Sequence, residues 1–361
     1  MGGLKTLTFE LANNMEGKIP PEICLLRESV VLVSFRGQLQ LKGTIPTEFG
    51  LLTKLTELGL LSTRLVGTIP TEFGLLQSVT RLMIANGHLS GHIPSEIGKL
   101  CSLSALVLTK TDLAGSVPIE IVQLPGLLSL IIQQCPGLNT EDALQEVVQR
   151  TQQLETLSFS SRTLGEEVPI PSEIGTLTDL KFLSLMDWNI HRTIPSQLGK
   201  LEKLVRLDLH GNSVSGTLPE ALLELTNLSG LNLGSNKLNG TLRSELFSKL
   251  THLRSLQING NNISGSIPTE VGLAPGLKTL ELQNTNLSGT LPEELLALEK
   301  LTSLVIMNTS LSGRIAEKLC DKMLQVETRC FGRQCYGVKS KNSICQETFL
   351  CGCRCSPCPV N

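Results

Sequence analysis

The sequence predicts an α/β solenoid, in which short repeats stack on one another and no single globular core forms. Leucine recurs at fixed spacings along most of the 361 residues. Aromatic residues make up only 3 % of the chain, with one Trp and one Tyr. A compact core of this size normally buries more rings, so the fold must bury many similar aliphatic side chains. Self-similarity at a fixed period near 24 residues is the signature of a repeat architecture.

One unit reads LxxLxLxxxxLxGxIPxExGxLxx when it is written from its first leucine. The unit beginning at Leu55 fills this pattern with Leu58, Leu60, Leu65, Gly67, Ile69, Pro70, Glu72, Phe73, Gly74 and Leu76. The first positions of successive units are Leu4, Val30, Leu55, Val79, Leu103, Leu127, Leu154, Leu180, Leu204, Leu228, Leu253, Leu277 and Leu301. About 13 units therefore occupy residues 1–315.

The LxL segment of each unit predicts a short strand, because side chains alternate between the two faces of a strand. Leu58 and Leu60 face inward, while Glu57, Gly59 and Leu61 face outward. Strands that stack at roughly 4.8 Å give a parallel sheet on the order of 60 Å long. At the GxIP segment the backbone turns at Gly, Ile points inward, and Pro donates no hydrogen bond.

The LxGxIPxExGxL hallmark resembles that of the plant-type leucine-rich-repeat family over roughly residues 1–315. The resemblance implies a curved right-handed superhelix with a parallel concave β-sheet, a short second side sheet, and 3-10 or short helices on the convex side. Family members are mostly extracellular, as receptor-kinase ectodomains, receptor-like proteins and polygalacturonase-inhibitor-like proteins. An extracellular or cell-surface location is therefore expected. Residues 1–11 lack the features of a secretory signal, so we expect the natural N-terminus to be incomplete.

Some units depart from the pattern. The ninth position, usually Asn in this family, is Asn only at Asn212, Asn236 and Asn261, and Trp188 is among its replacements. In an irregular unit at 127–171, residues 139–153 replace the IP segment. They predict a helix capped by Thr140 with an apolar stripe of Leu144, Val147 and Val148. This unit resembles the helix-bearing repeats of ribonuclease-inhibitor-like proteins.

The cysteines are unevenly distributed. Cys24, Cys101 and Cys135 lie within repeats, and we expect them to be buried small residues. An even cluster in a short segment predicts disulfides, with connectivity open and a metal cluster as the alternative. We interpret residues 316–361 as a cysteine-rich C-terminal cap, similar in its CxC pairs to secreted algal leucine-rich-repeat proteins. The cluster consists of Cys320, Cys330, Cys335, Cys345, Cys351, Cys353, Cys355 and Cys358.

Five N-x-Ser/Thr sequons agree with secretion, although chance alone would supply some of them. We predict glycosylation at Asn227, Asn239, Asn262, Asn286 and Asn308.

A ligand is expected on the concave face, on the outward residues around LxL, between about Leu61 and His210. Exposed apolar residues there favour a protein or peptide partner over a sugar, with a cell-surface co-receptor as one possibility. The alternative is that these positions tolerate any side chain. Trp188 fits either an interface anchor or a core residue. The predicted ligand-binding residues are Leu61, Met83, Val107, Ile131, Ser158, Ser160, Phe182, Met186, Trp188, Asp208 and His210.

Other functions have less support. Asp208 and His210 could perform general-base chemistry, but a flat open sheet supplies no pocket, so we expect no catalytic residue, resident metal or cofactor. Net charge −2 and pI near 6.3 give no reason to expect nucleic acid. No apolar stretch is long enough for a membrane span.

Two alternatives stay open. The first is an ectodomain-like fragment of a receptor-like kinase, although no kinase motif occurs here. The second is a cell-wall or matrix protein that binds polysaccharide, or ice, through a row of residues between Gly and Ile: Thr44, Thr68, His92, Ser116, Thr193, Thr217, Thr241, Ser266, Thr290 and Arg314.

Overall fold

The computed structural model describes residues 4–10, 16–160 and 168–312. The chain divides into two compact units, Met1–Asn189 and Ile190–Asn361. The predicted cap at 316–361, with its eight cysteines, lies outside the described residues, as does Arg314.

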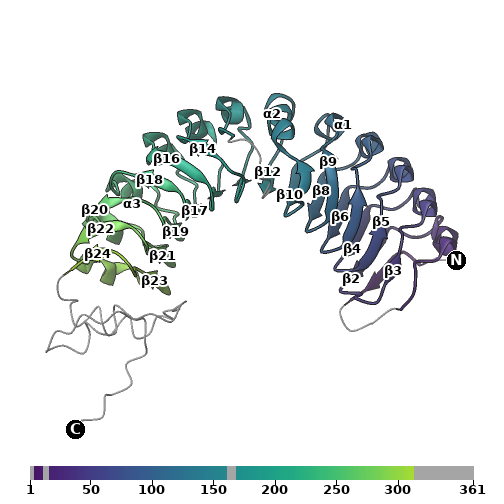
Figure 1. Ribbon diagram of the computed structural model, residues 1–361, viewed down its shortest axis with the longest axis horizontal. Helices are drawn as coiled ribbons and strands as arrows, with labels where there is room; N and C mark the ends of the chain where they lie inside the picture. Colours follow the sequence, from purple (N-terminus) through teal and green to yellow (C-terminus); the bar gives the residue numbers. More distant parts are fainter. Residues whose placement is uncertain (1–3, 11–15, 161–167, 313–361) are drawn as a thin grey trace, which may run out of the picture. The chain divides into compact units, whose positions relative to one another are not determined.

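In the first unit, each repeat contributes one strand to a parallel sheet, as the LxL spacing predicts. The strands lie on the inner side of this unit, and the helices lie on its outer side (Figure 1). Neighbouring strands pair in register, so that Leu58, Leu82 and Leu106 stack in one buried column. In sheet order the strands are β1 (Thr6–Phe9), β2 (Leu32–Arg36), β4 (Glu57–Leu61), β6 (Arg81–Ala85), β8 (Ala105–Thr109), β10 (Ser129–Gln133), β12 (Thr156–Ser160) and β13 (Phe182–Ser184).

The predicted side sheet and the predicted short helices of this unit are confirmed. The side sheet contains β3 (Lys42–Gly43), β5 (Arg64–Gly67), β7 (His88–Gly91), β9 (Asp112–Ser116) and β11 (Gly137–Asn139). The helical segments are the 3-10 turns η1 (Pro21–Leu26), η2 (Thr47–Leu51), η3 (Thr71–Leu75), η4 (Ser95–Lys99) and η5 (Ser172–Thr176), and the α-helices α1 (Ile119–Val122) and α2 (Glu141–Arg150).

The second unit repeats this plan, so the α/β solenoid that the sequence predicts is confirmed in each unit. Its inner strands are β15 (Arg206–Asp208), β17 (Gly230–Asn232), β19 (Ser255–Gln257), β21 (Thr279–Glu281) and β23 (Ser303–Val305). Two small side sheets contain β14 (His191–Arg192), β16 (Ser213–Thr217) and β18 (Lys237–Asn239), and β20 (Ser264–Gly265), β22 (Asn286–Gly289) and β24 (Ser310–Leu311). The helical segments are η6 (Ser196–Lys200), η7 (Glu220–Glu224), α3 (Glu245–Lys249), η8 (Thr269–Leu273) and η9 (Glu293–Ala297).

Glycine in the ExG segment allows the 3-10 turns of adjacent repeats to approach closely. A Cβ placed on Gly50 would lie 2.6 Å from the carbonyl oxygen of Glu72, and one on Gly74 would lie 2.7 Å from that of Glu96. Real Cβ atoms do not come this close to backbone. The glycine is therefore required by the packing between repeats.

Asparagine at the ninth position ties neighbouring repeats together in the second unit. The Asn236 amide nitrogen donates to the carbonyl oxygens of Leu209 and Leu233, at 2.9 and 3.1 Å. Its amide oxygen accepts from the backbone N–H of Val214 at 2.9 Å. Asn261 repeats this pattern one unit later. These side chains satisfy buried backbone groups that the turn after each strand leaves unpaired.

The predicted helix of the irregular unit forms as α2, with its apolar stripe buried. The prediction that Thr140 caps the N-terminus of this helix is wrong, because the Thr140 side chain makes no capping hydrogen bond. The Asn139 side-chain oxygen accepts from the backbone N–H of Glu141 at 2.9 Å instead. The Thr140 hydroxyl accepts a 2.7 Å hydrogen bond from the indole nitrogen of Trp188.

Trp188 is a core residue, so its prediction as a ligand contact is wrong. Its exposed fraction is 3 %, and its ring centroid lies 6.3 Å from that of Phe159. The donor on Trp188 needs a partner when the ring is buried, and Thr140 supplies that partner inside the unit.

We predict that Gly74→Ala destabilises the protein by about 2 kcal/mol, because the new methyl group would overlap backbone of the next repeat. Urea denaturation followed by circular dichroism measures the change. Gly87→Ala is the matched control, since its Cβ would have no neighbour closer than 3.7 Å. Equal stability losses in the two variants would contradict this explanation of the ExG glycine.

We also predict an energetic coupling of about 1 kcal/mol between Trp188 and Thr140 from their hydrogen bond. The measurement is a double-mutant cycle with Trp188→Phe and Thr140→Val, using the free energy of unfolding. If the two losses simply add, the hydrogen bond does not link α2 to the repeat that contains Trp188.

Candidate functional site

The concave face of the first unit carries a row of apolar side chains on adjacent strands. Strand register places Gly59 of β4 beside Met83 of β6, then Val107 of β8 and Ile131 of β10. The three larger side chains are half-buried, whereas the leucines on the opposite side of the same strands are buried. The structure therefore brings together the predicted residues Met83, Val107 and Ile131.

A second row lies two residues further along each strand. It places Leu61 beside Ala85, Thr109 and Gln133. Leu61 is half-buried, and Ala85 is 8 % exposed. The row changes from apolar to polar from β4 to β10, so the apolar surface is widest near β4 and β6.

Charged residues border the apolar row at the start of the strands. Glu57 and Arg81 face each other on β4 and β6, with 3.8 Å between carboxylate oxygen and guanidinium nitrogen. Such exposed pairs contribute little to stability. The sequence pattern contains these two residues at outward positions, but we did not predict them as part of the site.

The two serines predicted at this surface are buried, so their prediction as contacts is wrong. Ser158 and Ser160 of β12 are 5 % and 4 % exposed. The Ser158 hydroxyl accepts from the side-chain nitrogen of Gln133 at 2.7 Å, and that of Ser160 accepts from the backbone N–H of Gln134 at 2.9 Å. Both hydroxyls are used inside the unit, because neighbouring side chains cover them.

Phe182 and Met186 lie at the end of the first unit. Phe182 of β13 is 40 % exposed and pairs in register with Thr156, while Met186 is half-buried. An exposed phenyl ring on a strand can contact a partner, so both remain predicted ligand residues.

Asp208 and His210 lie in the second unit, where the hydrogen bond between them involves the backbone of His210. An Asp208 carboxylate oxygen accepts from the backbone N–H of His210 at 3.0 Å. Asn232 makes the same bond to the N–H of Gly234 one repeat later, so this contact is a repeat feature. Both residues are half-buried and remain predicted ligand residues only.

The predicted glycosylation sites are exposed in the second unit. Two of the side-chain nitrogens already donate hydrogen bonds, from Asn227 to the Glu202 carbonyl oxygen at 2.8 Å and from Asn308 to the Asn284 side-chain oxygen at 2.8 Å. The exposed residues are Asn227, Asn239, Asn262, Asn286 and Asn308.

The three cysteines within repeats differ in environment. Only Cys135 is buried, while Cys101 is exposed and Cys24 is intermediate, so the expectation of three buried cysteines is wrong for Cys101. Burial raises the pKa of the Cys135 thiol, and the Thr111 hydroxyl lies 3.1 Å from its sulfur. Cys135 therefore stays protonated and acts as a small interior residue at the ninth position.

The Thr row of the side sheet is exposed where the structure describes it. The methyl groups of five of these Thr residues lie beside the Gly of the following repeat, as Thr44 does at Gly67 and Thr68 at Gly91. The described members are Thr44, Thr68, His92, Ser116, Thr193, Thr217, Thr241, Ser266 and Thr290.

Two searches of the described residues concern other functional classes. Within 4–10, 16–160 and 168–312, no group of three or more His, Cys, Asp or Glu residues could hold a metal ion. In that same part of the chain, no helix has the length and apolarity to cross a membrane.

Family models described as leucine rich repeat match residues 202–263 and 276–298. No curated protein matches the chain.

Several solved structures are similar. One is the LRR ectodomain of the plant membrane receptor kinase GASSHO1/SCHENGEN3 from Arabidopsis thaliana, in complex with CASPARIAN STRIP INTEGRITY FACTOR 2. It has 28 % identity and a TM-score of 0.63, over 87 % of this chain and 42 % of that one.

The plant peptide hormone receptor RGFR1, in complex with RGF2, is also similar, with 28 % identity and a TM-score of 0.58 over 88 % of this chain and 57 % of that one. A TDR receptor at 23 % identity has a TM-score of 0.71, which shows the fold alone. This chain thus spans about half the length of these receptors' solved chains. With the repeat pattern and its strand register, these matches show a leucine-rich-repeat fold that is similar to that of plant receptors.

Proposed function

We propose that this protein is a non-catalytic binding module that recognises a protein or peptide partner on the concave face of its first unit. The observation that carries the proposal is the row of half-buried apolar side chains at Met83, Val107 and Ile131, with Leu61 beside it. Apolar side chains that stay in contact with water do not stabilise a monomeric protein. A partner that covers them removes this apolar surface from water, which favours binding.

The geometry of the row suits a polypeptide. Adjacent strands hold the side chains about 4.8 Å apart, so a partner that lies across the strands can place one apolar side chain after another against them. Glu57 and Arg81 then provide polar contacts at the rim. An apolar centre with a charged rim is the usual composition of a protein interface.

The similar structures support a peptide or protein ligand for this module. Two of them, at 28 % identity, are receptors solved in complex with CASPARIAN STRIP INTEGRITY FACTOR 2 and with RGF2. An extracellular or cell-surface location follows for the proposed module, since one of the two is described as an ectodomain, and the five exposed sequons agree with it.

Within this proposal, the chain acts either as a secreted module or as an ectodomain-like part of a receptor-like kinase. A matrix protein that binds polysaccharide is a second candidate. The exposed row that contains Thr44 and Thr68 favours it, because a regular line of hydroxyl groups matches a repetitive surface. A protein partner on the concave face would leave this row unused.

We predict that Met83→Glu together with Val107→Glu weakens binding of a peptide ligand more than tenfold, because each carboxylate would have to be desolvated at the interface. Linear peptides selected on the unmodified protein from a phage-displayed library serve as the probe. Their dissociation constants are measured by biolayer interferometry.

The control variant is Leu75→Glu on η3, which places the same charge on an exposed apolar position (53 % exposed) away from the concave sheet. It is expected to bind like the unmodified protein. If the concave-face variant also binds unchanged, the site is elsewhere. If wall polysaccharide binds saturably and this binding is lost on Thr68→Lys, the matrix alternative replaces this proposal.

A further inference from the structure

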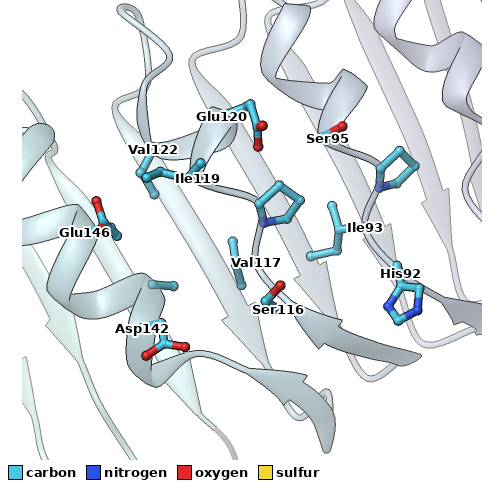
Figure 2. A pocket seen from close by; sticks show the side chains of 13 residues that line it. His92, Ile93, Ser95, Ser116, Val117, Ile119, Glu120, Val122, Asp142 and Glu146 are labelled. Atoms are coloured by element: carbon cyan, nitrogen blue, oxygen red, sulfur yellow. The ribbon is translucent and has the colours of Figure 1, made fainter.

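A groove of about 670 Å³ lies on the outer side of the first unit, where residues of η4, α1 and α2 and the segments before η4 and α1 line it (Figure 2). It lies apart from the concave face, on other elements, and the proposed function does not use it. Its central lining residues are Val117, Ile119, Glu120, Asp142, Ala143 and Glu146.

The groove lies where the glycine of the ExG segment, which allows close packing between repeats, is replaced by another residue. Gly98 stands where the ExG glycine belongs, and it lets η4 approach the next repeat so closely that a Cβ on it would overlap Glu120. In the next repeat the equivalent residue is Val122, which has a side chain and is 1 % exposed. Accordingly α2 packs less closely on α1 than α1 packs on η4. This looser packing leaves room for the part of the groove that α1 and α2 line.

The walls of the groove carry negative charge. Glu120 comes from α1, and Asp142 and Glu146 come from α2 (Figure 2). None of the described residues that line the groove is Lys or Arg. Glu146 is paired with Arg150 at 2.6 Å, and Asp142 accepts a 3.5 Å hydrogen bond from the Asn139 side-chain nitrogen. Glu120 and Asp142 are both exposed, and neither has an ion pair with another described residue. Two carboxylates therefore remain for a partner's cation.

The floor of the groove is apolar. Ile119 is 39 % exposed, and Val117 and Ala143 lie beside it with 8 % and 4 % exposed. A small hydrated cation would leave Ile119 uncovered. Lysine and arginine combine an aliphatic stem with a charged head, so either can cover the floor and reach the carboxylates together.

We propose that this groove binds a basic side chain, arginine or lysine, from a short segment of a partner protein. The stem lies on Ile119, and the cation reaches a carboxylate of the groove wall, Glu120 or Asp142. Charge complementarity identifies the partner: it presents a basic segment with an adjacent apolar residue. Its contact with the groove is independent of any ligand on the concave face.

The test uses the full chain with its isoleucine methyl groups labelled for NMR. The probe is the peptide acetyl-Leu-Arg-Leu-Arg-amide, and its control has citrulline in place of arginine, with nearly the same shape and no charge. We expect the arginine peptide to shift the Ile119 methyl signal with a dissociation constant on the order of 1 mM. The buried Ile258 methyl in the second unit should not shift.

Glu120→Gln combined with Asp142→Asn is expected to weaken this binding at least about fivefold, and raised salt should weaken it further. Both residues are exposed, so the fold should be retained, which circular dichroism checks. The matched control is Glu72→Gln, because Glu72 holds the same repeat position as Glu120 without α2 beside it.

Three results would overturn the proposal. They are an Ile119 signal that does not respond to the arginine peptide, equal binding of the citrulline peptide, and an equal loss in Glu72→Gln. The concave variant with Met83→Glu is expected to bind the arginine peptide normally, which separates failure of this groove from failure of the proposed function.

Discussion

In-register parallel pairing of successive strands is the constraint on which the rest of each unit depends. It stacks Leu58, Leu82, Leu106 and Leu130 at the spacing of a β-sheet, and every one of them is 0–1 % exposed. No repeat could bury these side chains alone, so the stability of each repeat comes from its neighbours. The same register places the outward residues in rows, and the concave-face site is a by-product of it.

Different residue types occupy the ninth position of the repeat, and the side chain of each fills the interior and places its polar atoms against partners. In the second unit, Asn236 and Asn261 bridge three backbone carbonyl oxygens and one N–H of neighbouring strands and turns. In the first unit, Thr111 and Cys135 contact each other there, and the Cys135 thiol also donates weakly to backbone carbonyls. Trp188 fills the position with a ring and sends its only donor to Thr140. The interior thus tolerates very different side chains wherever their polar atoms find partners.

The fold could be predicted from the sequence because its signal is repeated many times, whereas details of single contacts could not. Periodicity correctly placed the inner strands, and the apolar stripe placed the helix α2, whereas the side sheets were expected from the resemblance to the plant-type family. It could not decide between Asn139 and Thr140 as the cap, because both residue types cap helices and the choice depends on the distant Trp188. It treated Ser158 and Ser160 as accessible because alternation indicates the face of a strand and not what covers it. The proposed ligand residues on the concave face have the right orientation, but no pattern in one chain specifies a partner.

Val122 in place of glycine also affects how the array holds together. In a linear array the free energy of folding is approximately a sum of terms for each repeat and for each junction between neighbours. The junction between α1 and α2 has looser packing on its outer side, while β8 and β10 keep full strand pairing on the inner side. On its outer side, this junction therefore contributes less to folding than the junction between η4 and α1. The pairing of β8 with β10 consequently provides a larger share of the connection between these two repeats than strand pairing does one repeat earlier.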